Sequence, residues 1–166
     1  MNHREVMDLE IHKENPWGFF DGAAQNDLCG GGALLFLSDT HFFELTFGLG
    51  EGTNNFVEFV SLKLLLIFAI EQGCRTINFF GDSMNVINWK RGIHQCRNLR
   101  LANLLSSTRE VLHGFDSFSC RHVYRENNQK VDQASKEGLQ MAMGTWKVKE
   151  FREGMTQEYY HRPFID

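Results

Sequence analysis

The sequence lacks three features that would each point to a class of protein. Its four cysteines lie far apart with no C-x-x-C pair, which argues against a zinc knuckle or a disulfide framework. The longest apolar run, residues 56–70, is interrupted by polar residues and is too short to span a bilayer, and the N-terminus is too charged for a signal peptide. A net charge of −4 provides no overall positive field for nucleic acid. We therefore expect a soluble, intracellular protein without a membrane partner, in which any contact with nucleic acid is local.

The chain length fits one domain. A sequence of 166 residues with 42% apolar content is enough for one well-filled core. Residues 1–14 are charged and aperiodic and predict an N-terminal tail, and the turn signal Asn15-Pro16 marks the start of a domain at 15–144. Residues 145–166 have mixed charge and weak periodicity, which predicts a C-terminal tail or docking extension.

Apolar periodicity predicts an α/β order of elements. The expected strands are 17–24, 33–38, 41–49, 76–82 and 116–125, with a glycine-rich turn at 25–32. The expected helices are 54–72, 83–92, 98–113 and 128–143. This order predicts a mixed sheet in which the helix at 54–72 is a crossover, so that the first and fourth strands are neighbours.

Four acidic residues occupy positions that this topology brings together. Asp21 and Asp82 follow the apolar runs of the first and fourth strands, Glu58 lies about one turn into the crossover helix, and Asp132 lies near the start of the last helix. Converging carboxylates repel one another unless a cation lies between them. A charge on a central strand such as Asp21 is costly unless it is paired. The pattern predicts a divalent-metal site, although Asp132 also fits a helix cap.

Five motifs in order carry a resemblance to a known family. They are DGA at 21–23, GGGALLF at 30–36, TNNFVE at 53–58, GDS at 81–83 and YRENNQKVDQAS at 124–135. Together they resemble the type 1 ribonuclease H family, most closely the reverse transcriptase-like ribonuclease H domains of plant retroelements. The resemblance implies a ribonuclease H-like fold, with a five-stranded mixed sheet and helices on both faces.

The resemblance also implies an activity and a metal. It implies an endonuclease that hydrolyses the RNA strand of RNA–DNA hybrids by two-metal-ion catalysis. It assigns Asp21, Glu58, Asp82 and Asp132 as catalytic residues and as ligands of two Mg²⁺ ions, for which Mn²⁺ can substitute.

Substrate contacts are implied for a second group of residues. Asn54 and Asn55 match an asparagine pair that contacts the minor groove of the hybrid, and the alternative interpretation is helix capping. Arg121 and Arg125 flank the acidic edge and suggest a phosphate track, the alternative being solvated surface. His122 matches the position of an auxiliary histidine in the family, but its alternating pattern favours a packed strand histidine.

Departures from the family pattern keep a second function open. Gln25-Asn26-Asp27 replaces the usual Asn-Pro-Gly of the first turn, which places an acidic residue where a neutral substrate contact is expected. The alternative is a catalytically weak or inactive retroelement-derived module that binds nucleic acid or another protein. The sequence leaves open a fused or associated reverse transcriptase or a larger host protein, and it does not distinguish nucleus from cytoplasm.

Overall fold

The computed structural model describes residues 11–83, 86 and 99–161 and contains one mixed sheet of seven strands. The strand order is β5-β4-β1-β2-β3-β6-β7. The strands are β1 (Trp17–Gln25), β2 (Leu28–Ser38), β3 (His41–Glu51), β4 (Thr76–Gly81), β5 (Ser117–His122), β6 (Trp146–Arg152) and β7 (Met155–His161). The helices are α2 (Asn54–Glu71), α4 (Leu99–Leu112), the 3-10 turn η1 (Arg125–Asn127) and α5 (Gln129–Gly138). The predicted α/β class and the predicted pairing of the first and fourth strands are confirmed, since β1 pairs with β4 in parallel.

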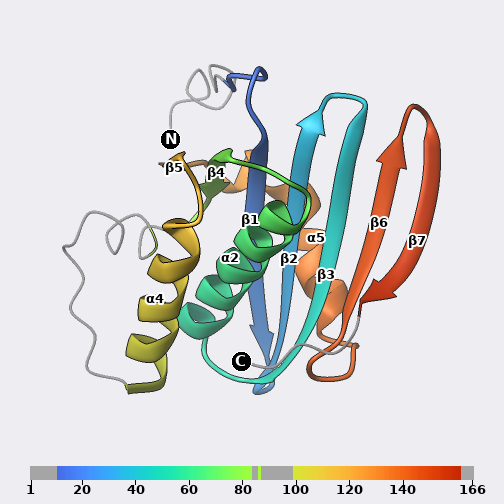
Figure 1. Cartoon of the computed structure of the whole chain (residues 1–166). Coiled ribbons are helices and arrows are strands. Elements are labelled where there is room, and N and C mark those ends of the chain that lie inside the picture. Colours follow the sequence, from blue (N-terminus) through green and yellow to red (C-terminus); the bar gives the residue numbers. More distant parts are fainter. Residues whose placement is uncertain (1–10, 84–85, 87–98, 162–166) are drawn as a thin grey trace.

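The helices cover both faces of the sheet, as predicted. Helices α2 and α4 lie together on one face and α5 lies behind the sheet on the other (Figure 1). Eleven residues of α2 are buried, which fits its nearly continuous apolar sequence, because α2 is enclosed between the sheet and α4. Within the described residues, no helix is long and apolar enough to cross a membrane.

The predicted glycine-rich turn at 25–32 is wrong, because most of it is strand. Only Asn26 and Asp27 form the turn, and both have positive φ (54° and 65°), the left-handed conformation that a two-residue hairpin turn of this kind requires. Gly30, Gly31 and Gly32 lie inside β2.

These glycines are needed because β2 is squeezed between two helices. A Cβ on Gly32 would lie 2.7 Å from the Ser135 backbone nitrogen of α5, and one on Gly30 would collide with the Ser135 carbonyl oxygen. On the opposite face, a Cβ on Gly31 would collide with the Ser61 hydroxyl of α2. The glycine run therefore sets the close approach of α2 and α5 to the sheet centre.

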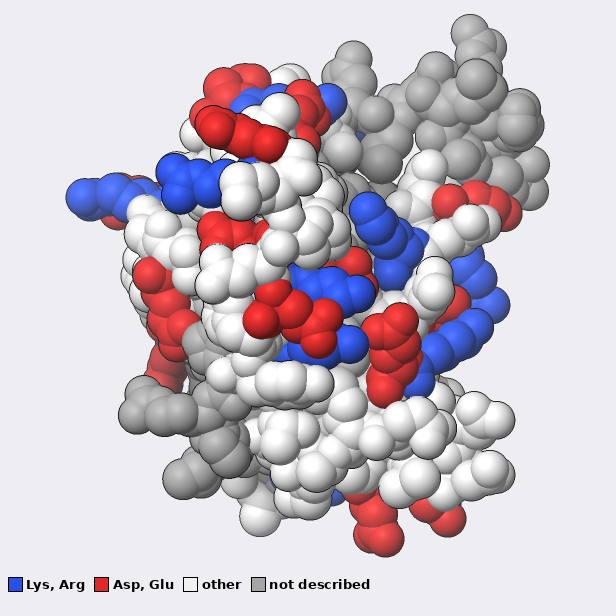
Figure 2. All heavy atoms as spheres, turned by 90° about the vertical axis from the view of Figure 1, so that its right-hand side faces the viewer, with Lys and Arg blue, Asp and Glu red and all other residues white. Residues whose placement is uncertain are grey.

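The sheet has seven strands where five were predicted, because β6 and β7 continue it beyond β3. Both strands lie in the segment 145–166, for which the sequence predicts a tail or docking extension. Trp146 and Val148 are buried, and Trp146 packs edge-on against Phe47 and Phe68. Most of the other residues of β6 are charged, namely Lys147, Lys149, Glu150 and Arg152. The face seen from the β7 side carries side chains of both signs (Figure 2). This mixture of charge conceals the strand pattern in the sequence.

The last helix is shorter than the predicted 128–143. It ends at Gly138, and residues 139–145 form turns that are hydrogen-bonded to β3. Gly144 donates its N–H to the Gly48 carbonyl (2.8 Å), and Gly48 donates to the Thr145 carbonyl (2.9 Å). Most of the predicted short helix at 83–92 lies outside the described residues.

The close contacts at these glycines predict that substitution lowers the stability of the domain strongly at some positions and weakly at others. Gly30→Ala should lower the free energy of unfolding by about 3 kcal/mol or more, because the new methyl group meets backbone atoms of α5 that have no room to move. Gly73→Ala is the matched control: its Cβ would meet no atom within 4 Å, so only its positive φ of 84° costs energy, about 1 kcal/mol. Urea unfolding of both variants measures the difference, and equal costs would contradict the close approach of α5.

Candidate active site

Asp21 and Asp82 meet at the centre of the sheet because β1 and β4 run in parallel. The register pairs Gly18 with Phe79 and Phe19 with Phe80. Continuing it by two residues places Asp21 beside Asp82, which follows the last residue of β4. Asp21 is 5% exposed, so its charge has little access to water. The predicted convergence of these two residues is what the topology produces.

Glu58 reaches the same point from α2 because of Gly22. A Cβ on Gly22 would lie 2.7 Å from Val57 Cγ1 and 2.9 Å from the Glu58 backbone nitrogen. The absence of a side chain at Gly22 therefore allows the second turn of α2 to rest directly on β1, next to Asp21. One carboxylate oxygen from each of Asp21, Glu58 and Asp82 lies within 4.8 Å of the other two.

Asp132 enters the cluster from the opposite face of the sheet, on the first turn of α5. Its side chain hydrogen-bonds to that of Asp21, so one of the two carboxyl groups holds a proton between them. Its Oδ2 also lies 3.1 Å from Lys136 Nζ, one turn further along the helix. All four predicted carboxylates thus line one open cavity of about 480 Å³ together with Gly22, Asn54, Asn55, Ser83 and Arg125.

The surroundings of Asp21 favour its protonated form. Burial is the largest cause, the nearby charge of Asp82 is the next, and the hydrogen bond with Asp132 follows. Together they raise the pKa of Asp21 from 3.8 to about 8, against a smaller opposing effect from the Gly22 backbone. Near neutral pH and without a bound cation, the cavity therefore retains a proton on Asp21.

Glu58 is affected in the same direction. Burial raises the pKa of Glu58, and the charge of Asp82 adds to this effect. A hydrogen bond from Ser83 and the positive charge of Arg125 oppose it. The cavity thus holds four carboxylates close together, and carboxylate oxygens are the ligands that hard divalent cations prefer.

Asn54 and Asn55 line the cavity at the start of α2. The N-cap of the helix is Thr53, whose Oγ1 accepts a hydrogen bond from the Phe56 N–H at 3.2 Å. The capping role that competed with substrate binding in the sequence therefore belongs to Thr53. Both asparagines remain placed beside the carboxylates.

The three basic residues predicted to contact or assist the substrate, Arg121, His122 and Arg125, lie in different places. Arg125 lines the cavity, and it belongs to η1 rather than to the strand on which the sequence placed it. Arg121 is exposed on β5, opposite Phe80 in the register, and the described cavity lining does not include it. His122 ends β5 beside Gly81, half-buried, with its ring 5.4 Å from that of Tyr124 in an edge-on contact.

Sequence reasoning missed two residues that hold the cluster together. Ser83 completes GDS and hydrogen-bonds to Glu58, and its signal in the sequence is a hydroxyl directly after Asp82. Asn128 is 1% exposed and donates from Nδ2 to the Phe20 carbonyl at 3.2 Å. Since Phe20 precedes Asp21 and Asn128 precedes α5, this bond joins the two elements that bear Asp21 and Asp132. Its sequence signal is its position four residues before Asp132, in the motif at 124–135.

Comparison with known proteins shows which family this chain resembles. A family model described as reverse transcriptase-like matches residues 19–138. A curated relative, ribonuclease HI of Halobacterium salinarum, is 33% identical over 91 residues. That match covers 55% of this chain and 46% of the relative, so it spans about half the relative's length.

Solved structures extend the likeness to about three quarters of the chain. The crystal structure of RNase H1 from H. salinarum is 30% identical, with a TM-score of 0.71, and the match covers 77% of this chain and 99% of that one. The N-terminal RNase H domain of a Mycobacterium tuberculosis protein is 20% identical, with a TM-score of 0.68 and coverages of 75% and 93%. LC11-RNase H1, isolated from compost and solved with an RNA/DNA hybrid, is 18% identical, with a TM-score of 0.64 and coverages of 74% and 95%. The last two show the fold alone. By its family model and by its match to the complete archaeal domain, this chain belongs to the type 1 ribonuclease H family, in its reverse transcriptase-like group.

Proposed function

We propose that this domain is a metal-dependent endonuclease that hydrolyses the RNA strand of RNA–DNA hybrids. The observation that carries the proposal is the convergence of Asp21, Glu58 and Asp82, whose carboxylate oxygens lie within 4.8 Å of one another, with Asp132 beside them. The family and the hybrid-bound relative support the choice of substrate.

The residues of the cavity fit a divalent metal. Every candidate ligand is a carboxylate, and Asp21 keeps a proton that a cation would displace. Asp21, Glu58, Asp82 and Asp132 would hold two Mg²⁺ ions, with Mn²⁺ as a substitute. When bound, such ions lower the pKa of an attacking water and stabilise charge on the leaving oxygen.

The chain's own groups supply orientation and charge around the scissile phosphate. Arg125 places a guanidinium in the cavity, suited to a non-bridging phosphate oxygen. Ser83 donates to Glu58 and fixes its position, and Asn128 holds α5 against β1. These contacts keep the carboxylates in place when no substrate is bound, so that little reorganisation is needed on binding.

Asn54 and Asn55 would provide selectivity for RNA. An amide both donates and accepts hydrogen bonds, so it can pair with a 2′-hydroxyl and with base edges in the minor groove. Both asparagines line the cavity beside the carboxylates, which supports a contact close to the phosphate to be cut. Arg121 would extend this contact surface as a phosphate ligand, and His122 would have an auxiliary role near the end of β5.

The direct test is cleavage of a labelled RNA–DNA hybrid by the purified domain in Mg²⁺ or Mn²⁺. We expect internal cuts in the RNA strand that leave 5′-phosphate and 3′-hydroxyl ends. Double-stranded DNA of the same sequence is the control. Tight hybrid binding with no cleavage in either metal would reject the enzyme and favour a binding module.

Substitution of the central carboxylates should abolish the reaction. Asp21→Asn and Asp82→Asn keep the side-chain shape but remove the charge that holds the metal, so the rate of hybrid cleavage should fall by about a hundredfold or more. Asp39→Asn, at the exposed turn between β2 and β3, is the matched control and should cleave at the normal rate. Full activity of Asp82→Asn would remove it from the metal site.

The pKa of Asp21 predicts how stability changes with pH when metal is absent. Because the folded-state pKa (about 8) is above the ordinary value of 3.8, the protonated carboxyl favours the folded state below 3.8, and this contribution is lost as the pH rises through 8. In EDTA, the free energy of unfolding should therefore fall by on the order of a few kcal/mol between pH 5 and pH 8, and the melting temperature should fall with it.

Asp21→Asn has no carboxyl group that ionises, so its melting temperature should fall less over the same pH range. The measurement is the difference in melting temperature between the two proteins at pH 5, 6, 7 and 8. Mg²⁺ at pH 8 should raise the melting temperature of the wild-type protein more than that of Asp21→Asn. Parallel curves for the two proteins would contradict the protonation of Asp21.

Substitution of the asparagine pair should weaken hybrid binding without changing the metal-dependent step. Replacing Asn54 and Asn55 together with alanine should weaken hybrid binding by roughly tenfold, at about 0.5–1.5 kcal/mol for each lost hydrogen bond. The Mg²⁺ dependence should not change, because no carboxylate is altered. Thr53→Ala is the comparison for helix capping and should cost about 1 kcal/mol of stability, which the double variant should not. A double variant that binds the hybrid normally would exclude the proposed contact.

A further inference from the structure

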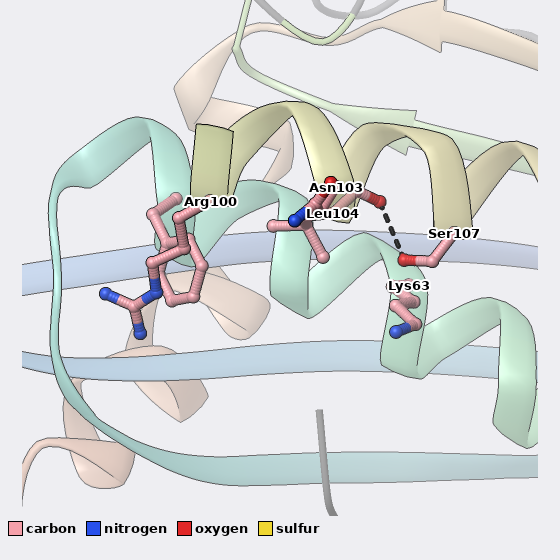
Figure 3. A pocket seen from close by; sticks show the side chains of 6 residues that line it. Lys63, Arg100, Asn103, Leu104 and Ser107 are labelled. Carbon is pink, nitrogen blue, oxygen red and sulfur yellow. Dashed lines mark hydrogen bonds between the residues drawn. The ribbon is translucent and has the colours of Figure 1, made fainter. Parts of the chain in front are cut away.

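Two surface features lie outside the acidic cavity. One is a hollow of about 390 Å³ between α2 and α4 (Figure 3). Groups that line it already have contacts within the protein, since Arg100 lies over the Phe56 ring at 3.8 Å and the Ser107 hydroxyl donates to the Leu104 carbonyl at 2.9 Å. The other is β7, the strand at one edge of the sheet (Figure 1), and its exposed side bears on how the domain associates.

Strand β7 has no strand on its outer side. The two-residue turn Glu153-Gly154 has positive φ at both residues (50° and 82°), and the flanking pair Arg152 and Met155 starts the β6–β7 ladder. Hydrogen bonding alternates along an antiparallel ladder, so every second residue of β7 directs its backbone N–H and C=O away from β6. These outward residues are Thr156, Glu158 and Tyr160. Within the described ranges 11–83, 86 and 99–161, no strand pairs with this side.

The edge at β7 also lacks the features that keep most sheet edges from pairing. Exposed edge strands usually carry a lysine, a proline or a bulge. The sequence MTQEYYH of β7 has neither lysine nor proline, its one carboxylate is Glu158, and it pairs with β6 residue for residue. The strand at the opposite edge, β5, is shorter and carries the exposed Arg121. Of the two edges, β7 is therefore better suited to accept a further strand.

An apolar row of the core crosses the sheet and stops at this edge. The register places Ala33 of β2, Leu45 of β3, Val148 of β6 and Tyr159 of β7 side by side. The first three are fully buried, whereas Tyr159 packs against the same core but is only half-buried. A ring from a further strand in this row would cover the exposed part of Tyr159.

The side-chain pattern of β7 fits a second copy of β7 in one antiparallel register. Directly opposite residues of two paired strands lie on the same face, so a two-fold axis between identical strands passes through a residue position. Centred on Glu158, the axis would set two carboxylates opposite each other, which is unfavourable. Centred on Gln157, it would set Tyr159 opposite Met155 of the second copy, and the two apolar rows would not meet. Centred on Tyr159, it joins the two rows.

The charges beside β7 favour the same register. When the axis is centred on Tyr159, Glu158 lies opposite Tyr160 of the second copy. Lys149 of β6 is already opposite Glu158 on its other side. Each carboxylate would then lie between an ammonium group and a phenol hydroxyl, and no two like charges of β7 would face each other.

From these observations we propose that the domain forms a dimer in solution by antiparallel pairing of β7 with β7 of a second copy, centred on Tyr159. Residues 157–161 of the two strands form the joining ladder, and the sheets of the two copies become continuous. This inference does not depend on the proposed nuclease function, because none of the residues described as lining the acidic cavity belongs to β7.

The oligomeric state is the first test. Sedimentation velocity over about 1–100 µM protein should show a reversible monomer–dimer equilibrium, with a dissociation constant in the micromolar range because one strand pair makes a small interface. Glu158→Lys should raise that constant by about tenfold or more, because the new ammonium group lies beside Lys149 and protects the edge as natural edge lysines do. A wild-type protein that stays monomeric over this range overturns the proposal.

The matched control is Glu153→Lys, which makes the same change in charge at the exposed β6–β7 turn, outside the paired residues. It should dimerise like the wild-type protein. Equal weakening in Glu153→Lys and Glu158→Lys would overturn the proposal, because the effect would then reflect net charge alone.

Glu158→Pro tests the hydrogen bonds of the joining ladder. Proline removes an N–H that faces away from β6, so the variant should be monomeric and should keep the melting temperature that the wild-type protein has when dilute and monomeric. A large fall in that melting temperature would show that this N–H bonds to β6, and would overturn the outward-facing edge.

Cysteine cross-linking tests the register. Tyr159→Cys would face itself across the axis in a non-hydrogen-bonded pair, with Cα atoms about 4.5 Å apart, which is within disulfide range. Mild oxidation should therefore give a covalent dimer on a non-reducing gel. Gln157→Cys should not cross-link, and the wild-type protein controls for the native cysteines. Cross-linking at residue 157 in place of 159 would overturn the register, and cross-linking at neither would overturn the interface.

Discussion

Repulsion among four carboxylates in one cavity is the constraint that the surrounding structure has to withstand. Asp21 is buried next to Asp82 and bonded to Asp132, and holding a proton to about pH 8 relieves part of this repulsion. A divalent cation relieves it further and competes with that proton. Metal binding, protonation and the stability of the domain are therefore linked through one side chain. Any ion that binds only the folded cavity stabilises the fold as well as the site.

The fold withstands this repulsion by close backbone approach on both faces of the sheet. Gly22 allows α2 to rest on β1, and Gly32 does the same for α5 on β2. Each glycine gives up side-chain packing and restricts a flexible backbone, which costs free energy. The gain is that carboxylates from two opposite layers reach a strand at the sheet centre. The hydrogen bond from Asn128 to the Phe20 carbonyl then fixes α5 against β1 at the level of Asp21.

The sequence was sufficient where periodicity and topology act together. The crossover helix required β1 and β4 to be neighbours, and this alone predicted that Asp21 and Asp82 would meet. The glycines of β2 misled, because a glycine run is typical of turns and its reason here is contact with helices distant in sequence. Strand β6 was missed because Lys147 and Lys149 alternate with Trp146 and Val148 and Glu150 follows, and β7 was missed because it is mostly polar. Arg125 lies on η1, so strand periodicity could not place it.

The balance of charge sets a condition on how this acidic domain would bind the proposed polyanionic substrate. With a net charge of −4, the protein repels nucleic acid at long range, and the carboxylate cluster adds to this effect when no cation is bound. Attraction must then come from short-range contacts placed beside the cluster. Arg125 lines the cavity beside the carboxylates. Since the Debye length is about 8–10 Å at physiological salt, a cation at this position would act on a bound backbone while the distant negative surface is screened. Affinity for the proposed hybrid would therefore depend on contacts inside the cavity more than on net charge.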